Sequence, residues 1–445
     1  MYLVLFPFII AQLVILARLA NNVPLGLKSR WVHPFNLLGV LIFITLIDFG
    51  FLFYDLSDAG FVRPSGFNLS LEGARSAFIY FFLWSTMAVG VLFYASDKPQ
   101  KSNLPKVVPN LLAGDIVFAI GAALSGITAI FVIVYSISMG DLLYVAVNRT
   151  TFFADNALAF IGVSFLVPSY IFLMFVRGFS KVTVAAGIGC LLLQSLMGQR
   201  GDPILITLFV AYLVSLTRGK LQAPFIYIIL PVGAWLITIL GYLYRFSGQF
   251  LNFSDYISSQ DGWMGLFRGN DVALSESYTS VFSSQALLHR EWYESFLGAV
   301  MALVPRELVP WKPFGASTQY TMIVDPQAWE LYRRELVIGG PANMYLDFGF
   351  IGGAIVTALL FYAWGRVIVR ANRMGTGTFW GPVAILSLYS FGRNDLYSVG
   401  LVLWPLIIIG LIYLLISKIT GPFSTYVKNN DSRLKYHARI NRRNI

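Results

Sequence analysis

Long apolar runs recur along this chain and restrict its fold more than any other feature. A helix needs roughly 20 consecutive apolar residues to span a bilayer, and many runs approach that length. Hydrophobic residues make up 57% of the chain and charged residues only 12%, whereas soluble domains carry about 25% charged residues. Helices satisfy their backbone hydrogen bonds within one segment, as lipid requires. The sequence therefore predicts an all-α polytopic membrane protein.

Eleven transmembrane helices are predicted. Their expected bounds are 2–20, 34–54, 77–95, 111–137, 155–176, 182–197, 203–217, 223–244, 343–365, 379–394 and 399–417. Two of them, 182–197 and 203–217, are short for a full crossing, so they are either tilted helices or a pair that enters the membrane and turns back. The predicted organisation is helices 1–8 over 1–244, a large loop over 245–342, helices 9–11 over 343–417 and a basic tail over 418–445.

The basic residues of the loops set the predicted orientation. Alternate loops divide the 32 Lys and Arg residues into 20 on one side and 12 on the other. Because loops rich in Lys and Arg stay in the cytoplasm, the N-terminus is predicted outside and the C-terminus inside. The basic tail then lies beside an anionic leaflet. The net charge of +10 therefore calls for no nucleic-acid partner.

The loop over 245–342 is the longest segment outside the predicted helices. Loops longer than about 15 residues are usually functional or disordered, and this one is rich in aromatic residues, which disordered segments lack. Residues 275–304 are expected to form one helix that ends before Pro305, with its apolar end on the membrane surface. Any active face is therefore expected on the outer side of the membrane.

The outer basic residues are almost all arginine, since eleven of the 12 are Arg and only Lys312 is Lys. A guanidinium group holds phosphate or carboxylate at two points, so we expect a bound anion. Arg200 lies in "MGQRGDPI", a turn in which Gly198 and Gly201 let backbone N–H groups approach an anion. The alternatives are that these arginines pair with outer acids and that Arg200 pairs with Asp202.

Several kinds of site are absent from the sequence. It contains no G-x-x-x-x-G-K-[ST] motif, no D-x-D and no G-x-S-x-G, and only one of its three histidines, His289, lies in an outer loop. We therefore expect neither a metal nor a cofactor. Without a nucleotide outside the cytoplasm, a substrate must carry its own leaving group, such as a lipid-linked diphosphate. Arginines would stabilise that group and a carboxylate would accept a proton.

Three stretches together resemble a known family. "PRELVPWKP" (305–313), "GGPANMYLDFGFIGG" (339–353) and "MGQRG" (197–201) are similar to segments of the bacterial O-antigen polymerases, the Wzy family, which are related to the O-antigen ligases. The number of spans and the single large loop late in the chain also resemble that family. The resemblance implies a membrane glycosyltransferase fold of the GT-C-like type, with the large loop in the periplasm and the protein in the bacterial inner membrane.

The resemblance also implies a reaction and its partners. The substrate would be an undecaprenyl-diphosphate-linked oligosaccharide, and repeat units would be polymerised by inverting, metal-independent transfer. Membrane lipid and a chain-length regulator protein are the other partners that it implies. Ala342 stands where the ligases carry a histidine before the Asn-x-Tyr-Leu segment, which argues against a ligase.

The resemblance assigns roles to individual residues. Arg200 is expected to bind the diphosphate and to serve catalysis. The resemblance leaves the base unassigned, and Glu335 and Asp347, beside His289, are our own candidates for it. The other residues expected to bind the substrate are Arg245, Arg268, Arg290, Arg306, Asn343 and Tyr345. The glycines of the "DFGFIGG" segment, Gly349, Gly352 and Gly353, are expected to let helices pack closely in lipid.

Three other functions are open at this point. A ligase would move a finished glycan to another acceptor. A transporter or flippase for a lipid-linked sugar usually has ionisable residues at mid-membrane and repeated halves, and neither pattern is apparent here. A non-catalytic assembly protein would use the large loop to bind another protein.

Overall fold

The computed structural model describes residues 7, 10–12, 70–96, 110–140, 144–178, 180–197, 274–283, 290–333, 335–373, 390–392 and 394–420. These residues form helices and connecting turns, with no strand among them. Five helical segments in this part of the chain are long and apolar enough to span a bilayer: Glu72–Val91, Leu111–Ser138, Ala157–Met174, Gly340–Trp364 and Leu396–Ile419. They make this a helical membrane protein in outline, as predicted. The predicted spans 2–20, 34–54, 203–217, 223–244 and 379–394 lie wholly or largely outside the described residues.

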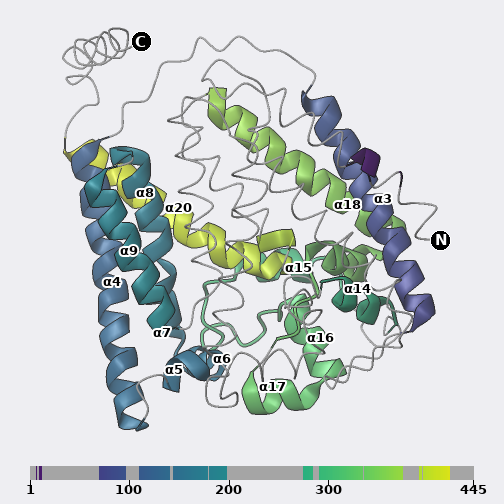
Figure 1. Ribbon diagram of the computed structural model, residues 1–445, viewed down its shortest axis with the longest axis horizontal. Coiled ribbons are helices and arrows are strands. Elements are labelled where there is room, and N and C mark those ends of the chain that lie inside the picture. Colours follow the sequence, from purple (N-terminus) through teal and green to yellow (C-terminus); the bar gives the residue numbers. More distant parts are fainter. Residues whose placement is uncertain are drawn as a thin grey trace.

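The described helices fall into three groups (Figure 1). One group holds α4 (Leu111–Ser138), α5 (Tyr144–Val147), α6 (Arg149–Asp155), α7 (Ala157–Ser164), α8 (Leu166–Arg177) and α9 (Lys181–Leu196). A second pairs α3 (Leu71–Ser96) with α18 (Gly340–Arg373), and α20 (Leu396–Ile419) lies between the two groups. The third consists of loop helices: α14 (Leu274–Ser283), α15 (Glu294–Val300), α16 (Ala316–Val324) and α17 (Pro326–Tyr332).

Helix α4 shows how these helices pack. Its buried positions are occupied mainly by small residues, and Ser125 donates a hydrogen bond of 3.0 Å to the carbonyl of Gly162 on α7. Its large apolar side chains face outward instead, with Ile127 67% and Ile130 64% exposed. Small residues at helix contacts and large apolar residues on the outer face are typical of helices packed in lipid.

An aromatic core joins α3, α14 and α18. Trp84 of α3 stacks on Phe361 of α18 with ring centroids 5.6 Å apart, and Phe282 of α14 stacks on Tyr345 at 4.0 Å. The Tyr80 hydroxyl donates to the carbonyl of Pro341 at 2.7 Å. These contacts fix the start of α18 against α3, so the loop helices are held at one end of the membrane helices.

Helix α18 is interrupted at Gly349, which has φ 73° and ψ −171°. Only glycine adopts this backbone region without strain, and no atom lies near the position of a Cβ at Gly349. Our expectation that Gly349 serves close packing is therefore wrong, and it serves a kink. A Cβ at Gly353, in contrast, would lie 2.7 Å from the hydroxyl oxygen of Tyr80 on α3, so glycine at this position permits close packing of the two helices. The predicted straight span 343–365 is consequently two helical legs.

The ends of the helices agree with the predicted alternation of spans. At one end, Asn110 before α4 donates to Thr420 after α20 at 2.9 Å, and Arg177 at the end of α8 pairs with Asp115 near the start of α4. At the other end, the backbone N–H of Ser70 before α3 donates to Ser283 of α14 at 3.0 Å. The loop helices thus lie opposite the end at which α20 finishes (Figure 1).

The single helix expected over 275–304 is not formed. Helix α14 ends at Ser283, residues 290 and 291 are not helical, and the short α15 begins at Glu294 and ends at Val300. The reason is tertiary, because Arg290 leaves helical geometry and donates three hydrogen bonds to side chains of α15, α16 and α18. The apolar periodicity of the segment is divided between two helices that pack on different partners.

Candidate active site at the first turns of α16, α18 and α20

Asp395 caps two helices at once. Its carboxylate accepts hydrogen bonds from the backbone N–H and the hydroxyl of Ser398 in the first turn of α20, both at 3.0 Å. It also accepts from the backbone N–H of Ser317 in the first turn of α16 at 3.0 Å. A carboxylate is favoured at a helix N-terminus by the unpaired N–H groups and the helix dipole. Asp395 is only 2% exposed, so we assign it to structure.

The close approach of these two helix starts depends on Gly315. A Cβ at this position would lie 2.6 Å from the Asp395 carboxylate, which is closer than real side chains come. Glycine at residue 315 therefore permits the shared cap, and the shared cap fixes the first turn of α16 beside the first turn of α20.

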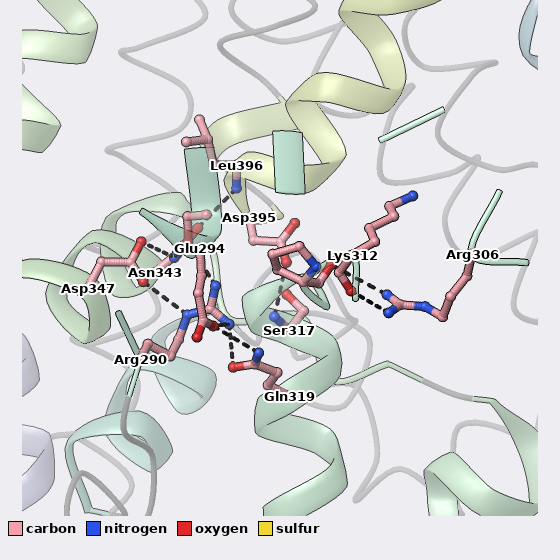
Figure 2. A network of polar contacts seen from close by, with 12 residues as sticks. Arg290, Glu294, Arg306, Lys312, Ser317, Gln319, Asn343, Asp347, Asp395 and Leu396 are labelled. Atoms are coloured by element: carbon pink, nitrogen blue, oxygen red, sulfur yellow. Dashed lines mark hydrogen bonds and ion pairs between the residues drawn. The ribbon is translucent and has the colours of Figure 1, made fainter. Parts of the chain in front are cut away.

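Arg290 is the centre of a buried polar network (Figure 2). Its Nε donates to Asp347 at 2.9 Å, and both side chains are fully buried. Its Nη1 donates to Gln319 at 2.5 Å and its Nη2 to Ser295 at 3.0 Å. Gln319 in turn donates to Glu294 at 3.0 Å. Every nitrogen of the guanidinium group thus has a protein partner.

Asn343 connects this network to α20. Its Nδ2 donates to Ser295 at 2.7 Å and to Asp347 at 3.0 Å, and its Oδ1 accepts from the backbone N–H of Leu396 at 3.1 Å. Asn343 and Asp347 are four residues apart on the first leg of α18, a spacing that places both on one face of a helix. The amide is fully buried, and it joins α18, α15 and α20.

Glu335 lies apart from that network and has a different environment. Thr318 donates to its carboxylate at 2.6 Å. Loss of hydration in the surrounding protein, together with the charge of Asp395, raises the pKa of Glu335 to about 7, against the opposite effects of the Thr318 hydrogen bond and the charge of Arg149. The residue nevertheless keeps exposed surface. Protein atoms therefore surround its carboxyl group, although the residue as a whole is exposed.

Arg306 and Lys312 form a pair of cations next to the start of α20. Lys312 donates to the carbonyls of Ala302 and Val304 at 2.9 and 2.8 Å, and Arg306 donates to those of Lys312 and Pro313. Within the described residues, neither cation has a carboxylate within salt-bridge distance. Burial lowers the pKa of both, and that of Lys312 falls to about 8 because the charge of Arg306 adds to the loss of hydration. The charge of Glu307 acts in the opposite direction on both.

The first turn of α16 connects these groups. Its consecutive residues Ser317, Thr318 and Gln319 donate to Asp395, Glu335 and Glu294 respectively. Thr321, one turn later, accepts from the backbone N–H of Leu336 at 2.7 Å, which holds the segment that carries Glu335. One helical turn therefore positions three carboxyl groups of the site.

The residues predicted to form the site are found in several places. Arg290, Asn343 and Asp347 meet in the buried network, and Arg306 contacts Lys312 (Figure 2). Glu335 is in a third place, where it accepts a hydrogen bond from Thr318. Tyr345 packs in the aromatic core against Tyr80 and Phe282. The remaining predicted residues, Arg200, Arg245, Arg268 and His289, lie outside the described residues.

Some residues of the site were not selected from the sequence. Lys312 could have been selected because it is the only lysine in the loops predicted to lie outside the cytoplasm. Asp395 precedes an apolar run and is followed by Ser398, a pattern typical of a helix start. Ser295, Thr318 and Gln319 had no such signal, because their role depends on which acids pack against them.

The described carboxylates do not gather into a metal site. In the part of the chain that the structure describes, no group of three or more His, Cys, Asp or Glu side chains is arranged to hold a metal ion. Comparison of the chain with protein-family models, with curated proteins and with solved structures gives no match.

Proposed function

We propose that this protein is a membrane glycosyltransferase that polymerises undecaprenyl-diphosphate-linked oligosaccharide repeat units at the periplasmic face of the bacterial inner membrane. The observation that carries the proposal is the pair of cations Arg306 and Lys312. Among the described residues neither cation has a carboxylate within salt-bridge distance, and Glu307 acts on both only through a longer-range attraction. Two partly buried like charges side by side are unfavourable unless an anion joins them. A diphosphate supplies such an anion, and Arg and Lys both bind phosphate oxygens.

A carboxyl group that is connected to the cations through Tyr397 supports the same proposal. Tyr397, in the first turn of α20, interacts electrostatically with Glu335, Arg306 and Asp395, and the ring of Tyr397 lies 4.9 Å from the Lys312 ammonium. A general base is most effective when its pKa lies near the working pH, which the pKa of Glu335, about 7, satisfies. Asp347 is less suited, because its carboxylate is buried and paired with Arg290.

The proposed reaction follows from these two groups. A hydroxyl oxygen of the acceptor repeat unit attacks the anomeric carbon of the donor glycan while the bond from that carbon to the diphosphate oxygen breaks. The diphosphate leaves with the bonding electrons, and the cations stabilise its charge. The Glu335 carboxylate accepts the proton of the attacking hydroxyl. Attack opposite the leaving group inverts the anomeric centre, and no metal ion takes part.

The test is polymer formation by purified protein that receives only lipid-linked repeat units. A ladder of products supports the polymerase, and no reaction until a second kind of acceptor is added supports a ligase. Replacing Arg306 and Lys312 together by Ala, or Arg200 by Ala, should shorten or abolish the ladder while the amount of folded protein is unchanged. Arg177→Ala is the control, because Arg177 is an exposed arginine at the opposite end of the helices. Normal long chains from the variants would reject the role of these cations.

A further inference from the structure

Two guanidinium groups and two aromatic rings form a continuous row next to the start of α16, and we call it the aromatic row. The guanidinium carbon of Arg306 lies 3.6 Å from the ring centroid of Phe314, and that of Arg333 lies 5.2 Å from the ring centroid of Trp329. The two rings meet edge to face, with centroids 6.2 Å apart. The aromatic row therefore has a cation at each end and two rings between them.

The aromatic row connects the two groups that take part in the proposed reaction. Arg306, at one end, belongs to the pair of cations with Lys312. Arg333, at the other end, lies two residues before Glu335 in the chain. The aromatic row therefore extends from the cations to the segment that carries the proposed base.

The backbone of Arg333 is in the left-handed region, with φ 47°. Arg333 follows the last residue of α17, and its N–H donates to the carbonyl of Trp329 at 3.0 Å, as a left-handed residue does when it ends a helix. Glycine and asparagine take this place readily, whereas most other residues are strained there. Ending α17 therefore does not require arginine, and residues held with such strain are concentrated at ligand sites.

The guanidinium group of Arg333 is available to an anion. Within the part of the chain that the structure describes, no carboxylate lies within salt-bridge distance of it. Attraction to an aromatic ring depends on the charge of the guanidinium group and requires none of its N–H donors. Arg333 and Trp329 are both partly exposed, so a ligand that contacts the ring also meets the cation on it.

The aromatic row offers two kinds of contact side by side. An aromatic ring packs against the C–H groups of a sugar ring, and a guanidinium group binds a carboxylate through two parallel hydrogen bonds. A hexuronic acid has both partners, because its carboxylate is attached to its pyranose ring. A neutral sugar has no anion for Arg333, and a phosphate group has no ring for Trp329.

We propose that the aromatic row binds a hexuronic acid of the glycan, with its carboxylate on Arg333 and its ring against Trp329. The inference rests on the proposed function, because it names the chemical class of one sugar in the repeat unit that is polymerised. Arg306 and Lys312 hold the diphosphate of the donor at the other end of the row. The acidic sugar then belongs to the acceptor unit, whose hydroxyl group Glu335 activates.

Binding of two matched pairs of disaccharides to the full-length protein in phosphatidylcholine nanodiscs tests the assignment. The pairs are cellobiouronic acid with cellobiose, and digalacturonic acid with galactobiose of the same linkage. Within each pair the members differ only in carboxylate in place of hydroxymethyl. In titrations followed by saturation-transfer NMR, the acid of at least one pair should bind about tenfold more tightly than its neutral counterpart, the effect of one charge-assisted hydrogen bond. Equal affinities within both pairs would overturn the proposal.

Arg333→Gly separates binding of an acidic sugar from a role in ending α17. Glycine relieves the left-handed backbone, so the unfolding temperature should not fall, whereas the preference for the acid should be lost. Arg333→Asn, which also tolerates this backbone, should lose the preference too. The matched control is Arg75→Ala, because Arg75 is an exposed arginine near the start of α3, at the end where the loop helices lie. It removes the same charge and should keep the preference.

Two results from these variants would overturn the proposal. One is an unchanged preference for the acid in Arg333→Gly, which would leave Arg333 with a structural role only. The other is an equal loss of preference in Arg75→Ala, which would show that the net positive charge of the protein attracts the acid without a specific site.

The proposed function fails in a different way. A preference for the acid that depends on Arg333, without any polymer from lipid-linked repeat units, rejects the polymerase and retains the sugar site. Polymer formation at equal rates from lipid-linked units with and without an acidic sugar, in both the native protein and Arg333→Gly, rejects the acidic sugar and retains the polymerase.

Discussion

Arg290 and Asp347 are 57 residues apart in the sequence, yet their side chains meet at 2.9 Å with no exposed surface on either. This ion pair fixes the segment before α15 to the first leg of α18. Removing Asp347 leaves the buried Arg290 guanidinium with only the more distant Glu294, at 3.8 Å, as a described ion-pair partner, whereas replacing both Arg290 and Asp347 by apolar residues removes the buried charges of the pair. Burial of this pair therefore predicts that a single substitution and a double substitution change the free energy of unfolding by different amounts.

Asp347→Ala should lower the free energy of unfolding by about 3–5 kcal/mol, measured by denaturant unfolding in detergent. The double variant Arg290→Met with Asp347→Leu should lose markedly less, because no charge remains buried. A single substitution that costs no more than the double one would contradict the burial of this pair.

Gly349→Ala should destabilise the protein by about 1–3 kcal/mol, because a residue with a Cβ is strained at the φ and ψ of this kink. Space is not the reason, since no atom lies near a Cβ at this position. Gly126→Ala in α4 is the control: it has equal space but helical geometry, and should stabilise by about 0.5–1 kcal/mol. Equal effects in thermal unfolding would show that the backbone at Gly349 is not strained.

The rate of polymerisation should rise with pH through about 7, because Glu335 must lose its proton to act as a base and its pKa is raised to about 7. Glu335→Gln should abolish this rise along with most activity. Thr318→Ala should move the midpoint to higher pH, since Thr318 stabilises the charged carboxylate, and Thr318→Ser should restore it. If the pH midpoint of the polymerisation rate is the same in Thr318→Ala as in the native protein, the group that titrates is not Glu335.

The same carboxyl group affects stability. Between its unfolded pKa of about 4.3 and its folded pKa of about 7, the folded state holds more protons than the unfolded state. The free energy of unfolding should therefore fall as pH rises through this window. Glu335→Gln should flatten that slope in denaturant titrations at successive pH values, and an unchanged slope would contradict the raised pKa.

Binding of undecaprenyl phosphate should weaken as pH rises through about 8, the lowered pKa of Lys312. The phosphate itself is fully charged by then, because its second pKa is about 6. Lys312→Arg keeps the cation at every pH and should move the loss to higher pH, whereas Lys312→Met should bind weakly throughout. An affinity that stays constant between pH 7 and 9 in the native protein would exclude Lys312 from the head-group site.

The sequence alone determined the helical membrane character and several helix bounds. The predicted spans 111–137 and 399–417 correspond to α4 and α20 within a few residues. This follows because partition into lipid and backbone hydrogen bonding in a helix both depend on local composition. Prolines, glycines and N-cap residues then set where each helix begins and ends, to within one helical turn.

The tertiary structure alone decided which polar groups meet. Nothing in the order of residues indicates that Ser317, Thr318 and Gln319 would each donate to a different carboxyl group. The sequence also does not indicate that Arg290 would form an ion pair with Asp347, or that Gly349 would kink α18. Pairings across such sequence distances depend on how the helices pack, and a buried charge takes whichever partner that packing supplies. For the same reason, the cations without a described salt bridge, Arg306 and Lys312, are evident only after the paired ones have been identified.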